Sequence, residues 1–168
     1  MTNINSFSGY PPINFNVKHI EIVDSYTPDK NSNLEYEMPY SPTMAIKTWA
    51  NSRLNAAGKD DLLQVMIHKA SATEIKKPKE KGISAAFKNN DSIYEIKIEV
   101  ELRVYGGGAI SDANAIANVS NSMTIPASYN VIERTNAYMS LLNKSMSMVN
   151  DKMEENISKY MNNYLAIY

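Results

Sequence analysis

Two histidines are the side chains of this chain that first suggest metal binding or proton transfer. An imidazole can ligate a metal or carry a proton near neutral pH. His19 and His68 both fall in stretches that predict β-strands, and no cluster of further ligands with metal-site spacing lies beside either of them. We therefore interpret both histidines as structural residues that remain sensitive to pH, and we expect no metal site.

Three glutamates lie on one side of an alternating stretch, and paired carboxylates can act as acid and base when one of them is buried. However, Glu95, Glu99 and Glu101 are interleaved with Lys97 and Arg103. That mixture of charges indicates an exposed surface laced with salt bridges rather than a catalytic pair.

Three consecutive glycines, residues 106–108, suggest either a phosphate cradle or a hairpin turn. A phosphate cradle needs a following helix whose N-terminus points at the anion, and the common motif continues with Lys and then Ser or Thr. Strand-like sequence follows here instead, so a hairpin turn is the better interpretation. We expect no cofactor, and we predict that the protein is not an enzyme.

The composition of the 168-residue chain limits the kinds of partner and of site that it can have. Lys and Arg number 17 against 18 Asp and Glu, for a net charge of −1, so no overall field attracts nucleic acid, which is not an expected partner. The absence of cysteine excludes disulfides, thiolate metal sites and cysteine nucleophiles within the chain. No apolar run approaches the roughly 20 residues of a membrane-spanning helix.

The clearest of the elements that must position any site is the stretch Tyr94 to Val104, where apolar and charged residues alternate strictly. Such alternation predicts a strand with one buried and one solvated face. A parallel sheet covered on both faces would not tolerate that row of charges. We therefore predict an open sheet with helices on one side only.

The remaining elements follow from caps, turns and periodicity. Residues 1–12 are polar and predict a flexible N-terminal tether, and residues 13–168 are expected to form a single domain. Strands are predicted over residues 14–23 (with a slip near His19), 63–75 and within 109–125, a loop over 24–40, and helices over 42–57 and 131–165. Ser41 is the expected N-cap of the first helix, and Asn130 with Glu133 predicts a capping box for the second.

The order of the predicted strands and helices, together with the lengths of the turns between them, predicts the architecture. The first two strands would pair in parallel through a crossover, and short turns would make the last three an antiparallel meander. The prediction is an α+β fold with two layers (β-α-β-β-β-α): a four-stranded mixed sheet, with a short helix and a long C-terminal helix on one face. At 1.5 Å per residue the last helix would reach roughly 50 Å and overhang the sheet, unless it is broken near Asn143 or Asn150.

Three regions are candidates for binding a partner. Lysines flank Ile83 and Phe87 in the loop 76–91, which suits a membrane surface or an acidic partner, although a solvated loop explains it as well. The long helix ends with Tyr160, Met161 and Tyr164. Its stripe of Met and Tyr residues either packs in the core or lines an apolar groove that could bind a partner. The third candidate is a cleft between Trp49 and the sheet.

The layout resembles the small bacterial lipoproteins that serve as auxiliary components of ABC- or MCE-type lipid transport, such as the paraquat-inducible auxiliary lipoprotein, and distantly the lipopolysaccharide-assembly lipoprotein. The resemblance rests on the alternating strand Ser92 to Arg103, the strand ending in Pro126 and the helix ending in Tyr160 to Leu165. The segment Lys81 to Phe87 is also similar to a loop of uncharacterised alphaproteobacterial lipoproteins.

The resemblance implies a periplasmic protein anchored to the outer membrane that assists lipid or lipoprotein transport. Its partners would be envelope proteins, with lipid contact through an N-terminal anchor that this chain lacks. Met1 to Asn5 show no signal-peptide pattern, so the signal and the lipidated cysteine are expected to have been removed. The alternative is a cytoplasmic interaction or assembly module that dimerises through its C-terminal helix.

Overall fold

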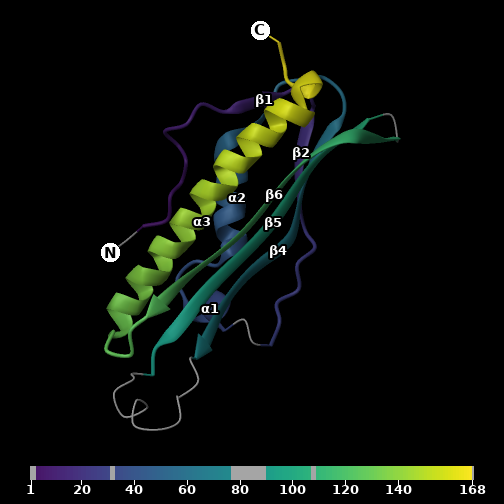
Figure 1. Cartoon of the computed structure of the whole chain (residues 1–168). Helices are drawn as coiled ribbons and strands as arrows, with labels where there is room; N and C mark the ends of the chain where they lie inside the picture. Colours follow the sequence, from purple (N-terminus) through teal and green to yellow (C-terminus); the bar gives the residue numbers. More distant parts are fainter. Residues whose placement is uncertain (1–2, 31–32, 77–89, 107–108, 168) are drawn as a thin grey trace.

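The computed structural model describes residues 3–30, 33–76, 90–106 and 109–167, with the side chains of 109–112 left aside. Along the chain, the elements are β1 (Ile13–Phe15), β2 (His19–Asp24), α1 (Leu34–Glu37), α2 (Pro42–Arg53), β3 (Leu54–Ala56), β4 (Leu62–Lys76), β5 (Ser92–Gly106), β6 (Ala109–Ile125), α3 (Val131–Tyr160) and the 3₁₀ turn η2 (Asn162–Tyr164). Figure 1 shows their arrangement.

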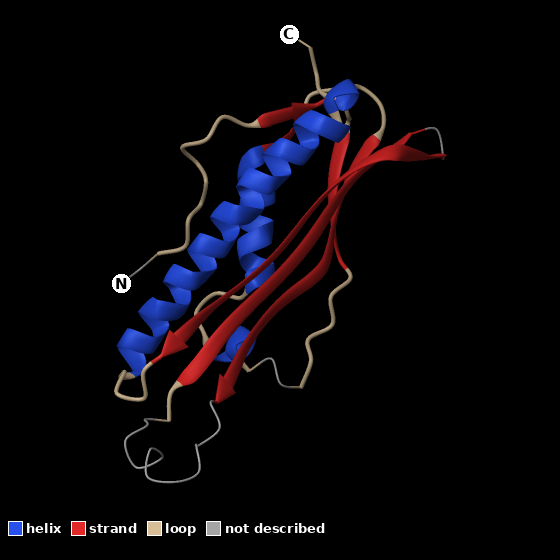
Figure 2. Ribbon diagram, viewed as in Figure 1, coloured by secondary structure: helices blue, strands red, loops and turns tan. Residues whose placement is uncertain are grey.

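Four strands form the main sheet in the order β2-β4-β5-β6. The β2–β4 pair is parallel, whereas β4–β5 and β5–β6 are antiparallel. The helices α2 and α3 lie together on one side of this sheet (Figure 2). The structure therefore confirms the predicted two-layer α+β fold, with its parallel first pair and its antiparallel meander.

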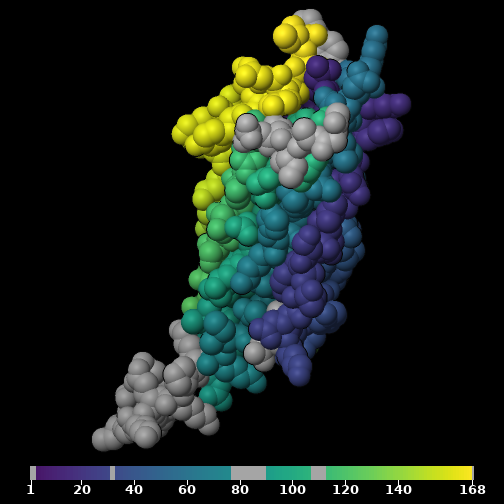
Figure 3. Space-filling view, turned by 90° about the vertical axis from the view of Figure 1, so that its right-hand side faces the viewer, coloured from purple at the N-terminus to yellow at the C-terminus, as the bar shows by residue number. Residues whose placement is uncertain are grey.

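The alternation in β5 sorts its side chains between the two layers. All six apolar side chains predicted to face the helices are buried: Tyr94, Ile96, Ile98, Val100, Leu102 and Val104. Among the described elements no helix lies over the opposite face of the sheet, and Figure 3 shows β2, β4, β5 and β6 side by side across it. We call this solvated side the open face.

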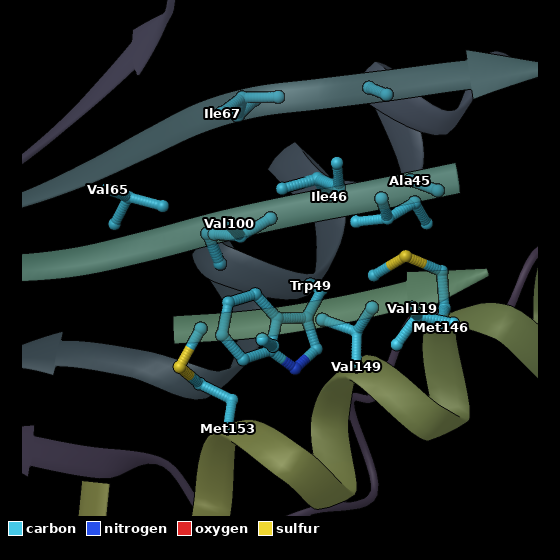
Figure 4. Packing of buried hydrophobic residues seen from close by; sticks show 14 of the residues in the cluster. Ala45, Ile46, Trp49, Val65, Ile67, Val100, Val119, Met146, Val149 and Met153 are labelled. Atoms are coloured by element: carbon cyan, nitrogen blue, oxygen red, sulfur yellow. The ribbon is translucent and has the colours of Figure 1, made fainter. Parts of the chain in front are cut away.

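Trp49 on α2 lies at the centre of the core between the layers. Its ring packs among Val149 and Met153 of α3 and the apolar side chains of the sheet (Figure 4). The stripe of α3 is buried as far as Ile157, and only Tyr160 at the end of the helix is exposed; the buried members are Tyr138, Leu142, Met146, Val149, Met153 and Ile157. The core between the two layers thus uses the helix face that was also a candidate surface for dimerisation.

Both predicted N-caps are present. Ser41 Oγ accepts a hydrogen bond from Met44 N at 3.2 Å. At the start of α3, Asn130 Oδ1 accepts from Glu133 N at 2.9 Å, and Asn130 N donates to Glu133 Oε2 at 2.8 Å. These bonds satisfy backbone N–H groups that have no partner within the first turn of a helix.

The long helix differs from its prediction in length and in reach. It runs without a break past Asn143 and Asn150, but it ends at Tyr160 rather than at Leu165. Its 30 residues span about 45 Å, whereas the 17 residues of β6 span about 56 Å. The predicted overhang was wrong because the helix ends at Tyr160 and is shorter than β6, the strand on which it packs.

The first predicted strand is two strands in different sheets. β1 pairs in parallel with β3, and β2 joins the main sheet. The first predicted helix accordingly ends at Arg53, because residues 54–56 form β3 instead of its last turn. A short helix, α1, also lies within the predicted loop 24–40.

The N-terminal segment is packed against the domain where the structure describes it, in contrast to the predicted flexible tether over residues 1–12. Phe7 is only 2 % exposed and belongs to the core. Asn143 on α3 fixes the segment from both sides, since its Oδ1 accepts from Asn5 N at 2.9 Å and its Nδ2 donates to Asn3 O at 2.7 Å.

Candidate functional site

The six residues predicted to bind a partner do not form one surface. Trp49 and Met161 are fully buried, so neither offers a surface to a partner. Tyr164 is half-buried and packs against the core. Tyr160 alone among the helix-end residues is exposed, with Lys159 Nζ 5.0 Å from the centre of its ring. The other two, Ile83 and Phe87, lie outside the described residues.

Apolar core side chains fill the space between Trp49 and the sheet where a cleft was predicted, and a buried polar network binds the indole nitrogen of Trp49. Trp49 Nε1 donates to Asn150 Oδ1 at 3.0 Å, and Arg53 Nη1 donates to the same oxygen and to Glu154 Oε1, each at 2.5 Å. Arg53 is only 3 % exposed, and its guanidinium lies 5.1 Å from the centre of the Tyr10 ring. This network joins α2, α3 and the N-terminal segment, so we assign it to stability.

The strongest cluster of polar groups lies on the open face around Glu101. Glu101 Oε2 accepts from Arg103 Nε at 2.6 Å and from Asn114 Nδ2 at 2.7 Å, and His68 Nε2 lies 2.9 Å from Glu101 Oε1. The four side chains come from β4, β5 and β6. The Glu101 side chain is only 10 % exposed, although the alternation predicted a solvated position.

A β-bulge explains why this cluster was missed. The register between β4 and β5 shifts between Ile67 and Lys69, so His68 is the extra residue. A bulge can re-aim a side chain, and the side chain of His68 lies against Glu101. The alternation does shift here, since the buried positions are 63, 65 and 67 before His68 but 70 and 72 after it, and this shift is the sequence signal that could have located the bulge.

Burial raises the pKa of Glu101, but hydrogen bonds from Asn114, Arg103 and His68 outweigh it and leave the pKa below its usual value. A carboxylate that stays ionised and already accepts several hydrogen bonds is a poor proton acceptor. Neither the surface hollow at the start of α3 nor the one at the loop 57–61 includes a residue of the cluster. Within the described ranges, no three His, Cys, Asp or Glu side chains are placed to hold a metal ion.

Large apolar side chains are exposed at the end of the molecule where α3 begins and β4 ends, the lower end in Figure 1. Val131 and Ile132, in the first turn of α3, are 79 % and 70 % exposed. Tyr36 on α1 is 74 % exposed, and Tyr129 and Ile75 also reach solvent. We call these five residues the apolar end.

Two hollows mark the surface of the described residues. One has a volume of about 350 Å³ and lies between the end of β6 and the first turns of α3. It is lined by Met123, Tyr129, Glu133, Asn136, Ala137 and Ser140. The other, about 360 Å³, is formed by Asn16 and the loop 57–61.

Neither a protein-family model nor a curated protein matches the sequence. Among solved structures, the chain is similar to the rare lipoprotein B of Shewanella oneidensis at 11 % identity and a TM-score of 0.45, over 86 % of this chain and 98 % of that one. It is similar to a neuraminyllactose-binding hemagglutinin homologue of Helicobacter pylori at 10 % identity and a TM-score of 0.46, over 91 % and 92 %.

A third structure, a minor lipoprotein of Acinetobacter baumannii, is similar at 10 % identity and a TM-score of 0.40, over 94 % of this chain and 100 % of that one. Two of these three structures are thus named as lipoproteins. None of the helices in the described residues combines the length and the apolar character that a membrane crossing requires.

Proposed function

We propose that the protein is a non-enzymatic, partner-binding component of the bacterial envelope. In this role it would be anchored to the outer membrane from the periplasmic side and would act as an auxiliary or scaffold in lipid or lipoprotein transport. The apolar end is the observation that carries the proposal. Full burial of a Val or Ile side chain is worth about 1.5–3 kcal/mol, so Val131 and Ile132 gain most by being covered by another protein.

Two further observations support binding over chemistry. Its neighbours keep Glu101 as an ionised carboxylate. The two oxygens of Glu101 are already in contact with His68, Arg103 and Asn114. The sequence resemblance to auxiliary transport lipoproteins gives the proposal its cellular setting. The stripe of α3 is buried within the chain, which argues against dimerisation through that helix.

Site-specific photo-crosslinking in cells tests the proposal. A photoreactive phenylalanine analogue would replace Ile132 in the protein expressed from its native gene. An identical replacement of Lys59, which is exposed beyond the opposite end of β4, is the matched control. We expect Ile132 to crosslink to a periplasmic or outer-membrane protein and Lys59 to give no such product. Crosslinks confined to cytosolic proteins, or the same products at both positions, would contradict the proposal.

A further inference from the structure

The two edges of the main sheet are protected to different degrees. An edge strand presents unpaired N–H and C=O groups, and charged residues, short length or a covering element normally blunt it. The edge strand β2 has only six residues, and His19, Glu21 and Asp24 are exposed on it. The other edge, β6, is 17 residues long and contains no charged residue and no proline from Ala113 to Ile125.

Helix α3 covers the outer backbone of β6 only in part. Lys152 Nζ donates to Asn118 O at 3.1 Å, and Asn156 Nδ2 donates to Ile116 O at 2.6 Å. These bonds establish that the even-numbered residues of β6 direct their backbone groups away from β5, since both groups of a residue in an antiparallel ladder point to the same side. The same therefore holds for Ser120, Ser122 and Thr124.

The outer backbone of these three residues has no strand partner. Ser122 N donates to Asn121 Oδ1 at 3.1 Å, a contact with its own neighbour. In the part of the chain that the structure describes, the remaining outward groups of Ser120, Ser122 and Thr124 make no hydrogen bond. The hollow lined by Met123 and Ala137 lies on the helix side of this stretch, so space is open beside it.

We propose that a second copy of this chain pairs with the end of β6, antiparallel and around a two-fold axis at Ser122. The stretch with unpaired outward groups lies between Asn118, whose carbonyl oxygen already accepts a hydrogen bond from Lys152, and Pro126. Ser122 is the middle residue of this stretch. Identical edges related by a two-fold axis are self-complementary, and an uncharged edge brings no like charges together. Each of the three residues would then exchange N–H and C=O groups with the second copy.

The two-fold axis at Ser122 fixes the register of this pairing. With Ser122 opposite Ser122 of the second copy, Thr124 faces Ser120, and Met123 faces Asn121 of the second copy. Asn121 Nδ2 is buried without a hydrogen-bond partner, and the hollow beside Met123 is lined by polar Glu133 and Ser140. The surface differs from the stripe of α3, which the single chain already buries.

Spin labelling measures this contact directly, because the chain has no cysteine and Ser122→Cys gives a single site. Directly opposed residues of this kind lie about 5.5 Å apart between Cα atoms. We expect concentration-dependent dipolar broadening between labels at residue 122. A label at Glu21→Cys on β2 should show none, and broadening there instead would overturn the proposal.

Two variants give the complementary test by sedimentation velocity of the otherwise unlabelled chain. Ser122→Pro removes an N–H that makes no ladder bond and so leaves the sheet intact. Ser122→Lys places two like charges at the axis on an exposed position. We expect the wild type to dimerise below about 1 mM and both variants to remain monomeric, with the circular dichroism of the wild type.

Thr73→Lys, on the same face but two strands away on β4, is the matched control and should dimerise like the wild type. The proposal fails if the wild type stays monomeric throughout, or if the dimer persists in both Ser122 variants. If Ser122→Pro does not fold, Ser122→Lys alone decides the outcome.

Discussion

Glu101 links three strands on the open face, and it does so as an anion. Its two oxygens hold His68 on β4, Arg103 on β5 and Asn114 on β6. Hydrogen bonds to charged groups contribute about 1.5–3 kcal/mol each. This cluster is therefore an electrostatic clamp across the sheet, and its strength depends on the protonation of one carboxyl group.

Acid should release this clamp. The pKa of Glu101 is lower in the folded chain than the ordinary value of 4.5. Its stabilisation is therefore complete above about pH 4.5 and is lost as the pH falls through the folded-state pKa. We expect Glu101→Gln to lower the free energy of unfolding by about 1.5–3 kcal/mol at pH 7, and the gap to the wild type to shrink on acidification.

Urea titrations between pH 7 and pH 3 would measure that gap. Glu99→Gln, two residues away on the same face of β5, is the control and should behave like the wild type. A difference between Glu101→Gln and the wild type that stays constant over this range would contradict the assignment.

The buried network at Asn150 illustrates what residue-level patterns leave out. Arg53 falls within the predicted helix 42–57, and an arginine side chain on a helix is normally expected to be exposed to solvent. Its burial depends on Asn150 and Glu154, about a hundred residues away in sequence. Periodicity carries no information about such a partner, so neither the buried Arg53 nor the filled space beside Trp49 was predictable.

At the scale of elements, the sequence predicts what local spacing decides. The alternation of β5, the cap at Ser41 and the capping box at Asn130 are local patterns, and all are present. β3 was missed because Leu54 continues the apolar spacing of α2 and because its strand partner, β1, is some 40 positions earlier. The bulge at His68, in contrast, shifts the alternation of β4 at two consecutive polar residues, so it could have been found from the sequence.

The corner between β3 and β4 depends on Gly58, where two segments of backbone meet. A Cβ added to Gly58 would lie 2.6 Å from the backbone carbon of Asn16 and 2.6 Å from Val17 N. Backbone atoms cannot swing aside as side chains do. We expect Gly58→Ala to lower the free energy of unfolding by about 1–3 kcal/mol, measured as a lower urea midpoint.

Gly9→Ala is the matched control, because nothing lies within 4 Å of a Cβ at Gly9. Its effect should stay within about 0.5 kcal/mol. Equal midpoints for the two variants would show that the corner is more adaptable than the packing implies.

At the scale of the whole molecule, the N-terminal segment belongs to the folded domain. Phe7 is buried in the core, and the segment crosses α3 at Asn143. Truncation of a buried Phe to Ala costs about 3–5 kcal/mol. We expect Phe7→Ala to lose stability on this scale in thermal and urea unfolding, whereas Ser8→Ala, at an exposed neighbour, should not. Unchanged stability of Phe7→Ala would restore the prediction of a free tether.

β1 also meets the far end of the described chain. Asn16 N donates to Tyr164 O at 2.8 Å, and Ala166 N donates to Asn14 O at 2.9 Å. Contacts between residues so distant in sequence form slowly, since the chain must first close a very large loop. We expect this junction to be the last part of the protein to fold, and its opening would release both ends of the domain in a single event.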